Sequence, residues 1–305
     1  MAAPFHEIFG LAGTPDGQYL IAGSFEEREA GSEAVAKPSG ISEDEHAAHH
    51  AVSPADFKED TTVVSTVSVV RTADGSMVRR IDVPGAVHHV AASPDGRFAV
   101  VTHPNGGGIS VIDLGSFAVV ANVATGPLPN FAVFSPDGEW VYVSNAGNDT
   151  VSVVNARRWT VLWNAVAGAS PEHVVLSRDG ATLYVNNVGD GTVSVIAVGE
   201  RRVVNTIPIG STVHGIDLSD DGRTLFVAAL GDDKLVGVDV ATGTYRGTTL
   251  APEPYHVATI HGTGKLYVSS ADEPKIWVVD QKSLAVIGEI PIGGKGHQMV
   301  QATGM

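Results

Sequence analysis

The sequence predicts an all-β protein with the β-propeller fold, built from four-stranded antiparallel blades. Three observations support this prediction. A histidine opens successive apolar segments at steps of 41 or 42 residues from His89 to His297, with Phe131 in its place once. Turns that contain Asp-Gly follow four of these openings and the earlier one at Phe5-His6. Glycine is abundant, at 35 of 305 residues, and charged residues make up only 17%. A fixed period in this range is the signature of a repeat architecture.

The N-terminal part is expected to form most of one blade. Residues 5–12 and 19–24 are predicted as its first two strands, and residues 61–71 and 77–83 as its third and fourth. The segments are rich in β-branched and aromatic residues, and turn residues separate the strands within each pair.

An insertion, residues 25–60, interrupts this blade. It carries ten acidic and three basic residues, few apolar ones, and His46, His49 and His50. We expect a loop or a partly helical flap on the same face as the recurring histidines. A degenerate extra blade is the alternative, but residues 56–60 have little strand character.

The clearest blade follows the insertion. Its strands are predicted at residues 130–135, 140–145, 150–155 and 160–166, where Val, Tyr, Thr and Trp alternate with turns of Gly, Asp, Asn and Pro. The same order of strands recurs from His89, His173, His214 and His256. Four antiparallel strands for each repeat are typical of a propeller blade.

The number of blades depends on how the chain closes. Six units are complete or nearly so, and residues 296–303 are expected to begin a seventh inner strand. We predict a single domain over residues 1–305 with seven blades, the last one thin or completed by the insertion. A six-bladed ring with an added strand is the alternative.

The second strand of several blades carries a short motif. Tyr142-Val143-Ser144-Asn145 is followed by Thr150-Val151-Ser152-Val153-Val154, and Tyr184-Val185-Asn186-Asn187 by a similar segment. Looser copies start at Tyr267 and Leu225. The motif resembles the YVTN-type propeller repeat. This resemblance implies the fold, and it implies little about function because such propellers host many activities.

The recurring histidine predicts a metal site. In a propeller the first strand of each blade lines the central channel, so equal spacing places these side chains at one height. Neutral imidazole is a common ligand for transition metals. A purely structural ring, with each imidazole bonded to a neighbouring carbonyl, is the alternative. The candidate metal ligands are His6, His88, His89, His173, His214, His256 and His297.

Two known propeller families hold metals in a similar way. Nitrous oxide reductase is similar in its propeller, where histidines at the starts of the inner strands hold a copper cluster. Carotenoid oxygenases hold one iron with four axial histidines. These resemblances imply a metal site at the histidines named above. The chain has no cysteine, which the electron-entry copper of the reductase needs, so nitrous oxide reduction is not expected.

Three further residues are candidates for catalysis. Glu172 and Tyr255 each precede a ring histidine and could donate or accept a proton, and His103 is expected on the same rim. An ordinary hydrogen-bonding role is the alternative for each. No residue is assigned to an organic cofactor.

Together these features predict a soluble metalloprotein that acts as an enzyme on a small molecule. Cu or Fe is favoured and implies redox or oxygen chemistry, whereas Zn or Mn would imply a lyase or hydrolase such as a lactonase. A non-catalytic binding propeller is the remaining alternative. The net charge of −15 argues against nucleic acid and anionic membranes as partners. No signal peptide is recognised, so the sequence as written predicts a cytoplasmic protein, or a periplasmic or secreted one if a leader was removed.

Overall fold

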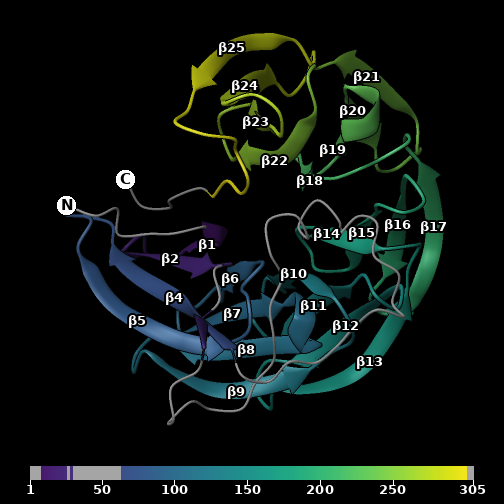
Figure 1. Cartoon of the computed structure of the whole chain (residues 1–305). Coiled ribbons are helices and arrows are strands. Elements are labelled where there is room, and N and C mark those ends of the chain that lie inside the picture. Colours follow the sequence, from purple (N-terminus) through teal and green to yellow (C-terminus); the bar gives the residue numbers. More distant parts are fainter. Residues whose placement is uncertain (1–7, 26–27, 30–62, 301–305) are drawn as a thin grey trace. The chain divides into compact units, whose positions relative to one another are not determined.

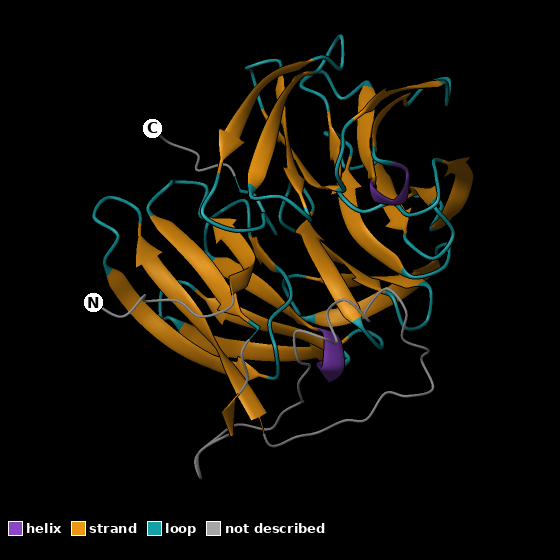
Figure 2. Ribbon diagram, turned by 45° about the horizontal axis from the view of Figure 1, so that its top comes forward, coloured by secondary structure: helices purple, strands orange, loops and turns teal. Residues whose placement is uncertain are grey.

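The computed structural model describes residues 8–25, 28–29 and 63–300. They form strands almost throughout, and Figure 2 shows two short helical turns among them, Pro104–Gly106 and Leu230–Asp232. The strands form six antiparallel sheets, in which most strands pair with their neighbours in sequence (Figure 1). The predicted all-β fold with propeller-type blades is therefore confirmed.

The chain divides into two compact units, residues 1–165 with 302–305, and residues 166–301. The sheets of the first unit are β1 (Ile8–Gly13), β2 (Tyr19–Ser24), β3 (Arg28–Glu29), β4 (Val63–Arg71) and β5 (Met77–Pro84); β6 (Val90–Ala92), β7 (Phe98–His103), β8 (Gly108–Asp113) and β9 (Ala118–Ala124); and β10 (Pro129–Phe134), β11 (Trp140–Asn145), β12 (Thr150–Asn155) and β13 (Thr160–Val166). Those of the second unit are β14 (Pro171–Leu176), β15 (Thr182–Asn187), β16 (Thr192–Ala197) and β17 (Arg202–Pro208); β18 (Ile216–Leu218), β19 (Thr224–Ala229), β20 (Lys234–Asp239) and β21 (Tyr245–Thr249); and β22 (Pro254–Ile260), β23 (Lys265–Ser270), β24 (Lys275–Asp280) and β25 (Val286–Pro291).

Consecutive sheets within each unit pack face to face on apolar cores. Val100 and Val111 of one sheet, for example, pack with Val141 and Val154 of the next, and all four are completely buried. Middle strands such as β12 are buried on both faces, whereas the fourth strands β9 and β13 alternate between exposed and partly buried residues. This pattern places the middle strands between layers and the fourth strand at the outer edge of its sheet.

The five predicted Asp-Gly turns are present and are built alike. In each, the aspartate accepts a bond of 2.5–2.7 Å from a Ser or Thr hydroxyl two residues earlier. These hydroxyl bonds lower the pKa of the five carboxyl groups below its usual value. The following glycine has a φ of 68–73°, which favours glycine because other residues are strained there. The aspartates are Asp16, Asp95, Asp137, Asp179 and Asp221.

The structure describes a short part of the insertion and part of the last predicted strand. The two-residue strand β3 pairs with the start of β4, so the first sheet has five strands. The rest of the insertion, 30–60, lies outside the described residues. The seventh inner strand expected over residues 296–303 is not formed in its described part, 296–300, which is irregular. A strand needs a paired neighbour to satisfy its backbone groups.

Candidate functional site

Three of the inner strands begin with an irregular register. In β10, β14 and β22 the pairing shifts between the opening proline and the third residue after it. The residue before each proline has a positive φ: 49° at Leu128, 51° at Ser170 and 47° at Glu253. Such a shift is a β-bulge, which breaks the alternation of side chains between the two faces. Consecutive side chains such as Glu172 and His173 can therefore reach the same cluster.

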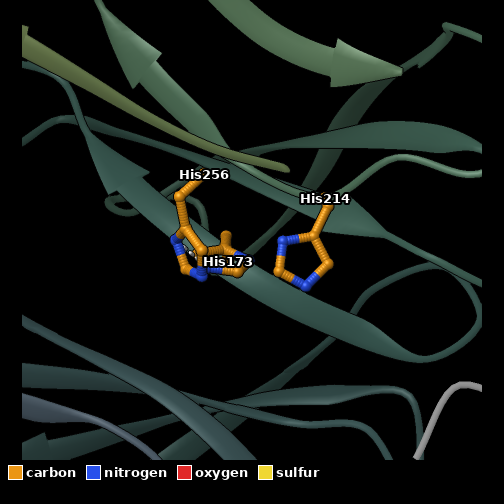
Figure 3. A group of neighbouring side chains, drawn as sticks. All are labelled: His173, His214 and His256. Atoms are coloured by element: carbon orange, nitrogen blue, oxygen red, sulfur yellow. Dashed lines mark hydrogen bonds between the residues drawn. The ribbon is translucent and has the colours of Figure 1, made fainter. Parts of the chain in front are cut away.

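Three buried histidines lie together in the second unit (Figure 3). His173 comes from β14, His214 from the segment before β18, and His256 from β22. They are only 2–7% exposed. His173 Nε2 lies 3.2 Å from His256 Nδ1, and the ring centroids of His173 and His214 are 4.5 Å apart. One ligand atom from each ring lies within 4.8 Å of the other two.

This spacing fits a metal ion. A four-coordinate ion with metal–nitrogen bonds of about 2.0–2.1 Å places two ligand nitrogens roughly 3.3–3.4 Å apart. The His173–His256 separation of 3.2 Å is close to this value, and the three ligand atoms all lie within 4.8 Å of one another. His173, His214 and His256 could therefore hold a metal ion. In the described part of the chain no other three His, Asp or Glu side chains converge in this way.

The Glu172 carboxylate lies next to the rings of two of these histidines. Its Oε2 atom is 3.2 Å from His214 Nε2 and 3.7 Å from His173 Nδ1, and the carboxylate is as deeply buried as the two rings. The carboxylate thus faces ring nitrogens other than the His173 Nε2 atom that approaches His256. A carboxylate in this position can accept protons from imidazole N–H groups and set the orientation of the rings.

Tyr255 and His297 complete the cluster. The Tyr255 ring stacks on His214 with centroids 3.7 Å apart, and His297 lies 5.1 Å from His256 and 5.7 Å from Tyr255. Burial raises the pKa of the Tyr255 hydroxyl well above its usual value, and the nearby Glu172 charge acts in the same direction. The tyrosine therefore stays protonated at neutral pH. His297 belongs to the irregular segment after β25 and is not one of the three convergent rings.

The corresponding histidines of the first unit have a different environment. His88 Nδ1 lies 2.9 Å from the carbonyl oxygen of Asn130. His89 stacks on Phe131 at 3.6 Å, and its Nδ1 accepts a bond from the Ala132 amide. A neutral His89 ring with an occupied Nδ1 carries its proton on Nε2, so it has no lone pair for a metal. The geometry favours the structural alternative for these two residues, and their role as ligands stays a prediction.

His103 is also held by structural contacts. It ends β7, where its Nδ1 donates to the Ala86 carbonyl at 3.1 Å and its Nε2 lies 2.8 Å from the Ser110 hydroxyl. Burial lowers its pKa to about 4, although the Ala86 bond acts in the opposite direction. The equivalent Asn145 donates to the Ser152 hydroxyl. His103 therefore fastens the second strand of its blade to the third, and its catalytic role stays a prediction.

The second-strand motif has a comparable structural explanation. Its third residue satisfies the backbone of the bulge: Ser144 accepts from the Phe131 amide, and Ser269 from the His256 amide. Its fourth residue, such as Asn187, bonds the hydroxyls of the third strand. The motif thus holds the start of the inner strand in place.

Some predicted residues lie outside the described part of the chain, namely His6 and the insertion histidines His46, His49 and His50. The β-bulge was not predicted from the sequence. A proline just before Glu172-His173 and before Tyr255-His256 was an available signal, because proline in a sheet often marks an edge or a bulge. In the described residues no helix is long and apolar enough to cross a membrane.

Comparisons with known proteins complete this description. The model of the family described as "Lactonase, 7-bladed beta-propeller" matches residues 98–280. Hydrazine synthase of Kuenenia stuttgartiensis is structurally similar, with a TM-score of 0.77 and 17% identity over 99% of this chain and 91% of that one. At this identity the likeness concerns the fold. No curated protein matches the sequence. The resemblances to YVTN-type repeats and nitrous oxide reductase stay predictions.

The matched region spans more than half of the chain, and it includes His103, Glu172, His173, His214 and Tyr255–His256. The family description agrees with the predicted seven blades, of which six sheets occur in the described residues. The chain therefore belongs to the lactonase family of seven-bladed β-propellers.

Proposed function

We propose that the protein is a metal-dependent hydrolase that opens a cyclic ester, with its metal ion held by His173, His214 and His256. The convergence of these three buried imidazoles carries the proposal. Family membership supports the lactone as substrate class. Three histidines with one open position are the ligand set of known catalytic zinc sites.

The reaction needs activated water. A metal bound to three imidazoles lowers the pKa of a coordinated water and polarises an ester carbonyl. In lactone hydrolysis the carbonyl carbon gains hydroxide from water, the ring carbon–oxygen bond breaks, and the ring oxygen takes the proton. Glu172 Oε2 lies 3.2 Å from a ring nitrogen of His214 and 3.7 Å from one of His173, and Tyr255 covers one face of His214. These contacts keep the ligands oriented and shield them from solvent.

The donor set favours a second candidate. All three ligands are imidazoles, which also suit copper and iron, the metals favoured by the sequence. In that case the protein would carry out redox or oxygen chemistry on a small molecule. The metal that the purified protein retains distinguishes the two functions.

The test uses the full-length protein purified without a histidine tag. Metal content is measured, and hydrolysis of δ-valerolactone is followed by acid release before chelation, after chelation and after Zn²⁺ is restored. We expect about one metal ion per chain and activity that disappears with the chelator and returns with Zn²⁺. Retained Cu or Fe without hydrolysis supports the redox function. A chain that neither retains nor binds metal refutes both.

A matched pair of variants connects activity to the cluster. His256→Phe keeps an aromatic ring but removes the ligand nitrogens, and it is expected to abolish retention of the metal through purification. His261→Phe makes the same change at a surface residue that is 57% exposed and lies 3.5 Å from Asp220. Loss of metal in both variants, or in neither, would contradict the assignment.

A further inference from the structure

Glu172 occupies an unusual place, because it is a buried carboxylate that faces two candidate ligands at once. The side chain is 3% exposed, and the contacts described for its carboxylate are to imidazoles. Removing a carboxylate from water is costly unless partners compensate. The arrangement therefore needs N–H groups that point at the carboxylate, and His173 and His214 are the rings in position to supply them.

The distances indicate which nitrogen of each ring faces which side. His214 presents Nε2 to Glu172 at 3.2 Å, and His173 presents Nδ1 to the same oxygen at 3.7 Å. His173 then has Nε2 on the side of His256, whose Nδ1 lies 3.2 Å away. In Figure 3 the two nitrogens of His214 lie at different sides of its ring. A nitrogen that carries a proton cannot bind a metal, so the carboxylate decides which nitrogen does.

We propose that Glu172 is a positioning residue that sets the tautomers of two metal ligands, and that the three histidines bind the metal through different ring nitrogens. His173 binds through Nε2, whereas His214 and His256 bind through Nδ1. This inference rests on the proposed metal site and assigns Glu172 a role different from the proton transfer expected from the sequence. Carboxylates that orient metal-bound histidines in this way typically contribute 10–100-fold in metal affinity.

The first experiment measures Zn²⁺ affinity of the full-length protein by competition with a chromophoric chelator. Glu172→Gln keeps the size of the side chain but replaces a charged acceptor with a neutral amide, whose NH₂ favours the wrong tautomer. We expect it to raise the Kd about 10–100-fold. Glu200→Gln is the matched control, because Glu200 is an exposed residue paired with Arg202. Equal affinities of the two variants would overturn the inference, provided that far-UV circular dichroism shows both folded.

The second experiment reads the tautomers directly. Long-range ¹H–¹⁵N correlation spectra of the Zn²⁺-loaded protein, labelled at histidine, separate Nδ1-bound from Nε2-bound rings. We expect two Nδ1-bound rings and one Nε2-bound ring, with His214 protonated at Nε2. Three rings bound through the same type of nitrogen would overturn the assignment. A merely structural role of Glu172 would leave these spectra unchanged in Glu172→Gln, and that result also counts against the inference.

A double-variant cycle separates a positioning residue from a direct ligand. If Glu172 acts through His214, the loss caused by Glu172→Gln becomes at least about threefold smaller in a His214→Ala background. An undiminished loss would mean that Glu172 does not act through His214 and would overturn the inference. Absence of Zn²⁺ binding to the unaltered protein would refute the proposed function together with this inference. Binding that does not depend on Glu172 refutes the inference alone.

Discussion

Replacing His103 with asparagine should remove a pH-dependent part of the stability. The substitution introduces the residue that the next two blades have at the equivalent position, Asn145 and Asn187. Asparagine there can donate to the Ser110 hydroxyl, as Asn145 donates to Ser152. The variant should therefore fold, and it has no imidazole to titrate.

The magnitude follows from the pKa of the buried ring. Burial holds the folded pKa at about 4, below the value of 6.5 for an exposed histidine. Between these values the unfolded state binds more protons, so the free energy of unfolding falls as the pH falls below about 6.5. At about 1.36 kcal/mol per pKa unit, the His103 contribution changes by about 2.4 kcal/mol between pH 7 and pH 4.5.

Urea denaturation at pH 7.0 and 4.5 measures this change. The aspartates of the turns titrate in both proteins, so the difference between the two pH dependences isolates His103. We expect the unaltered protein to lose about 2.4 kcal/mol more than His103→Asn over this range. Parallel pH dependences would refute the reasoning. If the unaltered protein loses less unfolding free energy than His103→Asn over this range, both ring nitrogens donate and the buried ring is a cation.

Three further predictions concern the metal site, a turn and the core. His173→Ala combined with His256→Ala should abolish metal retention, measured by elemental analysis, and leave the far-UV circular dichroism intact; unchanged metal content would place the ion elsewhere. Gly191→Ala should lower the free energy of unfolding by about 1–3 kcal/mol in urea denaturation, because the φ of Gly191 is +64° and an added Cβ would lie 1.8 Å from a backbone oxygen. Gly199→Ala is the control and should be nearly neutral, because a Cβ added there meets nothing within 4 Å. Phe226→Ala should lower the free energy of unfolding by about 3–5 kcal/mol, since this ring is completely buried in the core of the second unit; a loss below 1 kcal/mol would show that the core refills the space.

Much of the fold could be predicted because its signals are local and repeat. The strands Trp140–Asn145, Thr150–Asn155 and Thr160–Val166 were predicted with their observed bounds. A strand of alternating β-branched residues between Asp-Gly turns leaves little freedom in its ends. The end of the chain differed in its described residues, 296–300, which form no strand, because strand formation depends on a partner that no local pattern specifies.

The candidate site could be predicted only in part. The repeat identified the right positions, but it assigned the same role to each of them. His89 stacks on Phe131 of the next blade, whereas the equivalent His173 lies beside His214 of the next blade, with ring centroids 4.5 Å apart. The difference comes from the residue that the next blade supplies, and the period carries no information on how the two side chains meet.

The amino-acid sequence by itself determined the all-β architecture, the turn chemistry and the repeated position at which imidazoles occur, because each depends on residues close together in the chain. Only the tertiary structure decided which imidazoles converge. Bulges at the starts of β14 and β22 turn consecutive side chains toward one point, and the buried Glu172 then faces two rings from different sheets. Metal binding requires donor atoms from distant segments to lie within about 3–4 Å of each other, which the packing of whole sheets determines.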